Sequence, residues 1–93
     1  MHAVAVRVSI NDVENAQQML ENEVVPMVKQ VPGFVSGWWT RSQDGSNGMS
    51  LMVFESEEAA QGVKQRLESP EGPAGSDYVD LEGVEVREVV ANA

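Results

Sequence analysis

The chain of 93 residues has no cysteine, a single histidine, and only six basic residues against fifteen acidic ones, which gives a net charge of −9. The lack of cysteine excludes disulfides, thiolate zinc sites and a Cys–His nucleophile. The shortage of cations disfavours nucleic acids and anionic membranes as partners, because both are bound through clustered Lys and Arg. The negative charge is typical of a surface that keeps a protein in solution.

Long apolar runs are missing too. No stretch reaches the ~18 apolar residues of a membrane span, and the start Met1–Val4 has no basic region ahead of an apolar segment. We therefore expect a cytoplasmic protein. Hydrophobic residues make up 42% of the chain, as in ordinary globular proteins, and the length predicts one domain over residues 1–93.

Four segments have the patterns of β-strands. Ala3–Ile10 and Gly83–Val90 alternate apolar and polar residues, which is typical of strands with one buried face. Phe34–Arg41 and Met49–Glu55 carry apolar side chains on both faces. The seven residues Ser42–Gly48 between them include Asp-Gly and Asn-Gly, and predict a hairpin.

A first amphipathic helix is predicted between the first two strands. Asn11 and Asp12 both offer N-caps, Glu14 lies three residues after Asn11 as in a capping box, and Pro32-Gly33 ends the helix. Pro26 predicts a kink or a break, because proline lacks the backbone N–H and clashes one turn back. The residues expected on the buried side are Val13, Ala16, Leu20, Val24, Met27, Val28 and Val31.

A second helix is predicted over Glu57–Leu67, with Ser56 as its N-cap. Ser69–Glu82, which is rich in proline and glycine, is expected to be mostly loop. The order is then β-α-β-β-α-β. With right-handed crossovers it predicts an α+β, ferredoxin-like fold, in which two helices cover one face of a four-stranded antiparallel sheet.

The other face of that sheet is predicted to be bare and apolar. Neighbouring residues of a strand point to opposite faces, so either Trp38 or Trp39 must point away from the helices, as must either Phe54 or Leu51. Leaving each such side chain in water forfeits roughly 1.5–3 kcal/mol relative to burial. We therefore expect a homodimer through this face. The alternative is a monomer in which Ser69–Glu82 folds over the sheet.

Three stretches carry a resemblance to a known family: Val31–Gly37 at the junction of helix and strand, Met52–Ala60 from strand to helix, and a short final strand. With its element order, the chain resembles the dimeric α+β barrel superfamily and, within it, antibiotic-biosynthesis-monooxygenase-like domains. The resemblance implies a dimeric barrel and a cofactor-independent oxygenase, in which a small aromatic, polyketide-like substrate supplies the electrons to oxygen. It implies no metal and no bound cofactor.

The heme-degrading branch of that superfamily has a histidine ligand on its second helix. The corresponding segment here, Gln61–Arg66, contains none. This difference argues against heme cleavage.

The candidate substrate-binding residues are Trp38, Trp39, Arg41, Asn11 and Ser36. In the functional interpretation one tryptophan stacks on a flat ligand in a pocket between sheet and helices, and the polar residues orient its oxygens. In the structural interpretation one tryptophan fills the helix-facing core and the other fills the dimer core.

Two further alternatives stay open at this point. Arg7 and Arg41 are expected to pair with Glu85, Glu88 or Glu55 rather than to hold a substrate.

The scarcity of acid–base groups, with no histidine inside the chain and no cysteine, also favours a second function. This is a non-catalytic small-ligand-binding or stress-related protein on the same scaffold.

Overall fold

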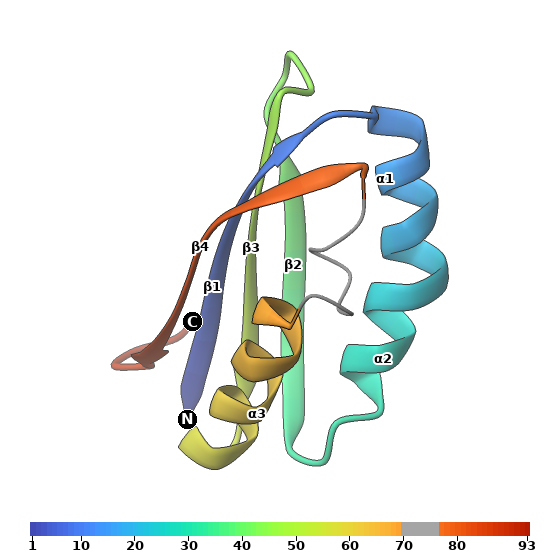
Figure 1. Ribbon diagram of the computed structural model, residues 1–93. Coiled ribbons are helices and arrows are strands. Elements are labelled where there is room, and N and C mark those ends of the chain that lie inside the picture. Colours follow the sequence, from blue (N-terminus) through green and yellow to red (C-terminus); the bar gives the residue numbers. More distant parts are fainter. Residues whose placement is uncertain (70–76) are drawn as a thin grey trace.

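The computed structural model describes residues 1–69 and 77–93 (Figure 1). Part of the predicted loop Ser69–Glu82 therefore falls outside the described residues. The elements are β1 (His2–Ile10), α1 (Val13–Met19), the π-helical turn η1 (Leu20–Val24), α2 (Val25–Lys29), β2 (Phe34–Arg41), β3 (Asn47–Phe54), α3 (Glu57–Glu68) and β4 (Val79–Glu88).

The four strands form one antiparallel sheet in the order β2-β3-β1-β4. The helical run α1–η1–α2 and the helix α3 lie against one face of it (Figure 1). The predicted ferredoxin-like α+β fold is confirmed. The core lies between the helices and this face, and its largest fully buried side chains are Phe54, Met52, Val4, Val28 and Val63.

Trp38 and Trp39 lie on opposite faces of the sheet, as strand geometry predicted, and so do Leu51 and Phe54. Strict alternation predicted Phe34 on the face of Trp38, but a register shift between Phe34 and Ser36 places it on the face of Trp39. Trp39 and Phe54 belong to the helix-facing core, where the Phe54 ring meets that of Phe34 edge-on at 5.8 Å between centroids. Trp38 and Leu51, which pair across the two strands, lie on the opposite face with 61% and 41% of their surface exposed. One face of the sheet is therefore both apolar and uncovered in the monomer.

The first helix begins one residue later than its predicted capping box. The Asp12 carboxylate, rather than the Asn11 side chain, accepts a hydrogen bond from the backbone N–H of Asn15 at 3.1 Å. Of the two predicted N-caps the helix therefore uses Asp12, and the capping box of Asn11 with Glu14 does not form. Asn11 and Asp12 are both good caps in principle, and the chain uses the one whose extended backbone immediately precedes the first helical turn.

Pro26 lies in the first turn of α2, which a π-helical turn separates from α1, so the predicted division into two segments occurs without an interruption of the helical run. The chain widens the turn just before Pro26: the Val25 N–H donates to the carbonyl of Leu20, five residues back, to form η1. A wider turn moves the preceding carbonyls away from the proline ring, which would clash with them in a regular α-helix. The helical run thus continues from Val13 to Lys29.

Strand β4 begins at Val79, four residues before the predicted start, and ends at Glu88 rather than Val90. A bulge explains the early start. Arg7 pairs with Gly83 and Val8 with Leu81, so that Glu82 between them is an extra residue. The inward-facing positions are therefore odd-numbered before the bulge and even-numbered after it, and this shift hides the alternation in the sequence.

Within the described residues, no helix is long and apolar enough to cross a membrane.

Candidate functional site

A cavity of about 140 Å3 lies between the helix-facing side of the sheet and the run α1–η1. Its lining is mostly apolar. The strands contribute Val6, Val8, Ile10, Trp39, Met52 and Val79, and the helices contribute Val13, Ala16, Met19, Leu20, Val24 and Leu67. A small, apolar space with a few polar groups is the usual form of a site for an organic ligand.

Trp39 forms one wall of this cavity and is held in place by its own strand. Gly37 leaves open the space next to the indole: a Cβ at this position would lie 2.8 Å from Cη2 and 3.0 Å from Cζ3 of Trp39. Phe34 closes the same space, at 3.5 Å from that position. The six-membered ring of Trp39 is therefore packed over Gly37, and its orientation is fixed without any hydrogen bond.

The polar lining consists of Gln17, Thr40, Arg41 and Ser50 with the backbone of Gly48. The Thr40 hydroxyl donates to the Met49 carbonyl at 2.7 Å, and the Gln17 amide donates to the Glu21 carboxylate at 2.9 Å. Arg41 is the one ionisable residue of the described lining.

The cavity opens at the end of the sheet that carries the β2–β3 hairpin. Its exposed lining residues come from the start of α1 and from the hairpin ends of β2 and β3: Val13, Gln17, Thr40, Arg41 and Met49. Val13 begins α1 next to the hairpin, since a Cβ on Gly45 would lie 3.1 Å from its Cγ2. A ligand would therefore enter between the start of α1 and the end of β2, past the Arg41 side chain.

The five residues that the sequence singled out are not all brought together. Trp39 and Arg41 line the cavity. Trp38 and Ser36 lie on the opposite face of the sheet, because they alternate with Gly37 and Trp39 along β2. Asn11 is not in the lining: its side-chain amide donates to the Asp80 carboxylate at 3.0 Å and joins β1 to β4.

The prediction that Arg7 and Arg41 form ion pairs with Glu85, Glu88 or Glu55 is wrong. No carboxylate of residues 1–69 or 77–93 lies within 4.0 Å of either guanidinium. Glu85 pairs instead with Arg87 at 3.0 Å. The Arg7 guanidinium lies over Gly83, where a Cβ would be 2.9 Å from it.

Sequence reasoning missed the contribution of the first helix to the site. Met19, Leu20 and Val24 line the cavity from α1 and η1. Pro26 was the available signal, because a proline within an amphipathic helix can be accommodated by a π-type turn, and such turns are frequent at functional sites.

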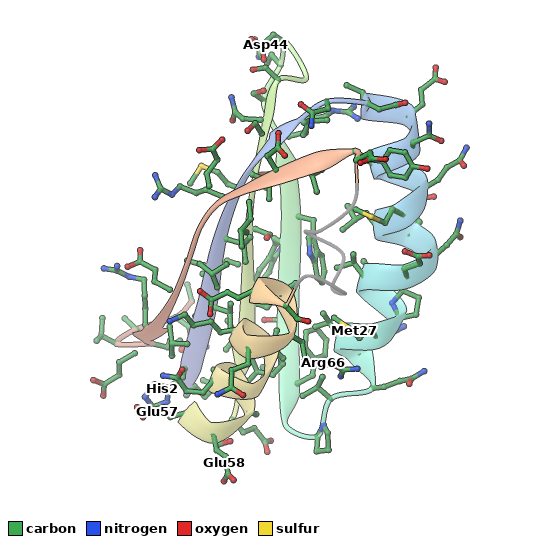
Figure 2. The ribbon with its side chains drawn as sticks, in the orientation of Figure 1. His2, Met27, Asp44, Glu57, Glu58 and Arg66 are labelled. Carbon is green, nitrogen blue, oxygen red and sulfur yellow. The ribbon has the colours of Figure 1, made fainter. Side chains whose placement is uncertain are left out.

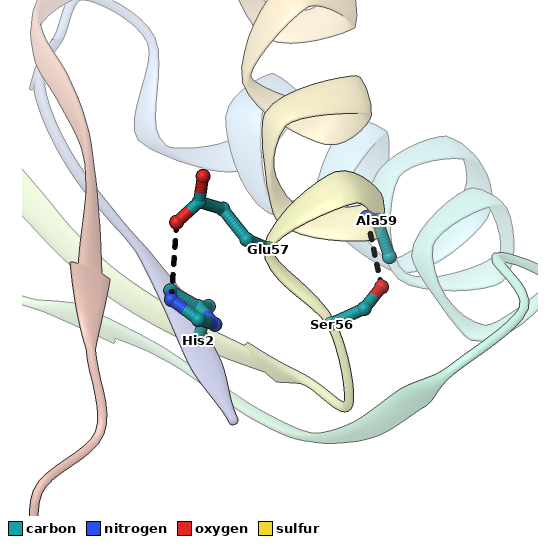
Figure 3. Close-up of polar contacts among 4 residues, drawn as sticks. All are labelled: His2, Ser56, Glu57 and Ala59. Atoms are coloured by element: carbon teal, nitrogen blue, oxygen red, sulfur yellow. Dashed lines mark hydrogen bonds and ion pairs between the residues drawn. The ribbon is translucent and has the colours of Figure 1, made fainter.

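The only histidine lies at the far end of the sheet from the cavity opening. Its Nε2 is 3.2 Å from the Glu57 carboxylate at the start of α3, beside the hydrogen bond by which Ser56 caps this helix (Figure 3). No group of three or more His, Cys, Asp or Glu residues that could hold a metal ion occurs in the described part of the chain.

Two other grooves occur among the described residues. One lies between α2 and α3, where Met27 and Arg66 approach each other (Figure 2). The other crosses the bare face of the sheet beside Trp38. Of these three hollows in the described part of the chain, the one behind Trp39 lies between the sheet and the run α1–η1.

No model of a known protein family and no curated protein matches this sequence. Solved structures do match its fold. SnoaB, a cofactor-independent oxygenase from Streptomyces nogalater, superposes with a TM-score of 0.72 at 14% identity, over 98% of this chain and 94% of that one. The monooxygenase ActVA-Orf6 of Streptomyces coelicolor, solved with nanaomycin D, gives 0.62 at 20% identity, over 99% and 92%.

A dimeric ferredoxin-like protein from an uncultured marine organism also matches, with a TM-score of 0.62 at 8% identity, over 100% of this chain and 98% of that one. At these identities the likeness is one of fold. The chain shares the ferredoxin-like α+β fold of these solved structures, which agrees with the fold that its sequence resemblance predicted.

Proposed function

We propose that this protein is a homodimeric, cofactor-independent monooxygenase that acts on a small aromatic compound bound in the cavity behind Trp39. The observation that carries the proposal is the combination of a mostly apolar cavity, one aromatic wall and one cation in a fold shared with a cofactor-independent oxygenase.

The chemistry requires little from the protein. A ring methylene is oxidised to a carbonyl by O2: one oxygen atom enters the product, and the other leaves as water with the two methylene hydrogens. The substrate supplies all four electrons, so that no redox cofactor is needed. The protein binds the ring, holds the reacting carbon near oxygen and excludes bulk water.

Trp39 and Arg41 have the two main roles in this proposal. The indole, packed over Gly37, offers a fixed flat surface on which an aromatic ring can stack. The Arg41 guanidinium at the opening can donate to an oxygen of the substrate and so orient the ring. Trp38 and Ser36 are left to the opposite face and have no part in binding.

The dimer is proposed through the bare face. Its exposed apolar side chains are Trp38 at 61%, Met49 at 59%, Val35 at 45% and Leu51 at 41% exposure. A patch of this kind is unusual on a monomer, and a two-fold axis through it would bring the same residues of two chains together. The dimeric ferredoxin-like neighbour is consistent with such an assembly.

Oxygen consumption tests the activity. Anthrones, which carry the ring methylene that the proposed step oxidises, are added to the protein in buffer with a chelator. Hydroxynaphthoquinones and hydroquinones, which lack it, complete the panel, and uptake is compared with the buffer alone. We expect uptake by the unchanged protein that is lost in Trp39→Ala and retained in Trp38→Phe. Turnover no faster than in buffer across the panel would remove the oxygenase proposal.

A specific observation favours a second candidate, a protein that binds small ligands without reaction. The described lining of the cavity contains no carboxylate, imidazole or thiol, so none of its side chains is an obvious general base. Quenching of Trp39 fluorescence by the same compounds without oxygen uptake would select this candidate.

A further inference from the structure

The polar groups of the cavity offer hydrogen-bond donors and one positive charge. We propose that the cavity selects an aromatic ligand with an anionic oxygen, a carboxylate or a phenolate, and that Arg41 is the residue that sets this selectivity. The inference rests on the proposed function in one respect, since it takes the cavity as the ligand site.

The donors can be counted residue by residue. The five N–H groups of the Arg41 guanidinium have no carboxylate partner within 4.0 Å among the described residues. The Thr40 hydroxyl already donates a hydrogen bond to the Met49 carbonyl, and the Gln17 amide donates one to the Glu21 carboxylate. Arg41 is thus the strongest free donor at the opening, and its planar fork suits a carboxylate or phenolate oxygen.

The charge of the whole chain makes this cation more significant. With fifteen acidic residues and a net charge of −9, the average surface repels anions. A guanidinium that meets no carboxylate among the described residues, at the entrance of a mostly apolar space, places a positive charge where an anionic ligand would enter. A neutral ligand would gain little from it, whereas an anionic ligand would gain a charge-assisted hydrogen bond.

The absence of a base from the described lining points the same way. If no side chain there can remove a proton, a ligand that must be an anion to react has to arrive already ionised. A cation at the entrance favours binding of the ionised ligand and disfavours its protonation to the neutral acid. The cavity volume of about 140 Å3 can hold one ring of a ligand, so single-ring compounds are suitable probes.

Benzoate and benzamide test the proposal, because they share one shape and differ in charge. Binding is followed by Trp39 fluorescence in the full chain carrying Trp38→Phe, so that Trp39 is the only tryptophan. Two further variants of this chain each remove one positive charge: Arg41→Gln at the cavity, and Arg66→Gln on α3 at the groove between the helices.

We expect benzoate to bind roughly tenfold or more tightly than benzamide. Arg41→Gln should abolish this preference, Arg41→Lys should retain part of it, and Arg66→Gln should leave it unchanged. Retention of the full preference in Arg41→Gln, or its equal loss in Arg66→Gln, overturns the assignment to Arg41.

Two outcomes distinguish a failure of the anion selectivity from a failure of the proposed function. Equal binding of benzoate and benzamide overturns the anion selectivity and leaves the aromatic site of the proposed function intact. If neither compound binds, and neither slows the hydrogen exchange that NMR measures at the cavity-lining amides, the anion selectivity and the aromatic site are both overturned.

Discussion

Trp39 and Gly37 share one site on the helix-facing side of β2, where the indole occupies the space that any side chain at residue 37 would need. Gly37→Ala is therefore expected to push the indole into the cavity. Overpacking of this kind costs about 1–3 kcal/mol of stability. Urea denaturation measures the loss, and the emission of Trp39 in a Trp38→Phe background reports the movement of the ring.

Gly62 provides both the control and a prediction of its own. It lies in α3, and a Cβ there would meet nothing within 4 Å. Gly62→Ala is expected to stabilise the protein by about 0.5–1 kcal/mol, because alanine loses less backbone entropy in a helix. If both alanine variants changed stability in the same direction and by the same amount, the packing of Trp39 over Gly37 would be refuted.

Phe54 is expected to be the most costly side chain to remove. It is fully buried and meets Phe34 edge-on at 5.8 Å. Phe54→Ala should cost about 3–5 kcal/mol, a large part of the roughly 5–15 kcal/mol that stabilises a typical domain. Val90→Ala, at a position 90% exposed, should change stability by less than about 0.5 kcal/mol. Thermal and urea unfolding of the two variants give the comparison.

The dimer proposal predicts a change of mass. Leu51→Lys places a charge at the centre of the bare face, opposite Trp38 on β2, and should reduce the mass in light scattering at micromolar concentration from two chains to one chain of 10.1 kDa. Gln18→Lys, on the exposed side of α1, adds the same charge and should leave two chains. A mass of one chain for the unchanged protein would contradict the proposal.

Asp44 at the tip of the β2–β3 hairpin (Figure 2) has a pKa lowered from 3.8 to about 2. Its carboxylate accepts hydrogen bonds from the backbone N–H of Ser46 and from the hydroxyls of Ser42 and Ser46. Because the folded-state pKa is the lower one, the stability that this carboxylate contributes is fully present above about pH 4 and is lost as the pH falls through about 2.

The titration of the Asp44 carboxyl carbon by NMR measures this pKa directly. Ser46→Ala removes one of the three donors and should move the midpoint from about 2 towards 3.8. A midpoint already near 3.8 in the unchanged protein would show that the hydrogen bonds of the hairpin do not form in solution.

The sequence predicted the fold because each element carried its own local signal. Alternation predicted β1, and the cap Ser56 located the start of α3 at Glu57. The opposite faces of Trp38 and Trp39 followed from strand geometry alone. What the sequence could not supply was the bulge at Glu82, since one extra residue in β4 shifts the pattern and makes its first half look like loop.

The candidate site was predicted less completely, for a similar reason. The sequence identified Trp39 and Arg41, but only the strand order decides which tryptophan faces the helices. Asn11 and Ser36 were predicted from their positions at a strand end and on a strand. In the structure Asn11 binds Asp80, and the register of β2 places Ser36 on the opposite face of the sheet. Met19 and Val24 reach the cavity from a helical run whose π turn depends on tertiary packing as well as on Pro26.

β1 brings the two ends of the chain together, because it pairs with β4 throughout its length and the Val89 N–H donates to the carbonyl of Met1 at 3.0 Å. Residues Met1 and Val89 therefore lie at the end of the sheet opposite the hairpin and the Arg41 entrance. The protein can be tethered to a surface or labelled at either end without blocking that entrance. A short peptide joining Ala93 to Met1, with new ends opened in the Ser42–Ser46 turn, would give a circular permutant suited to testing how the entrance is held.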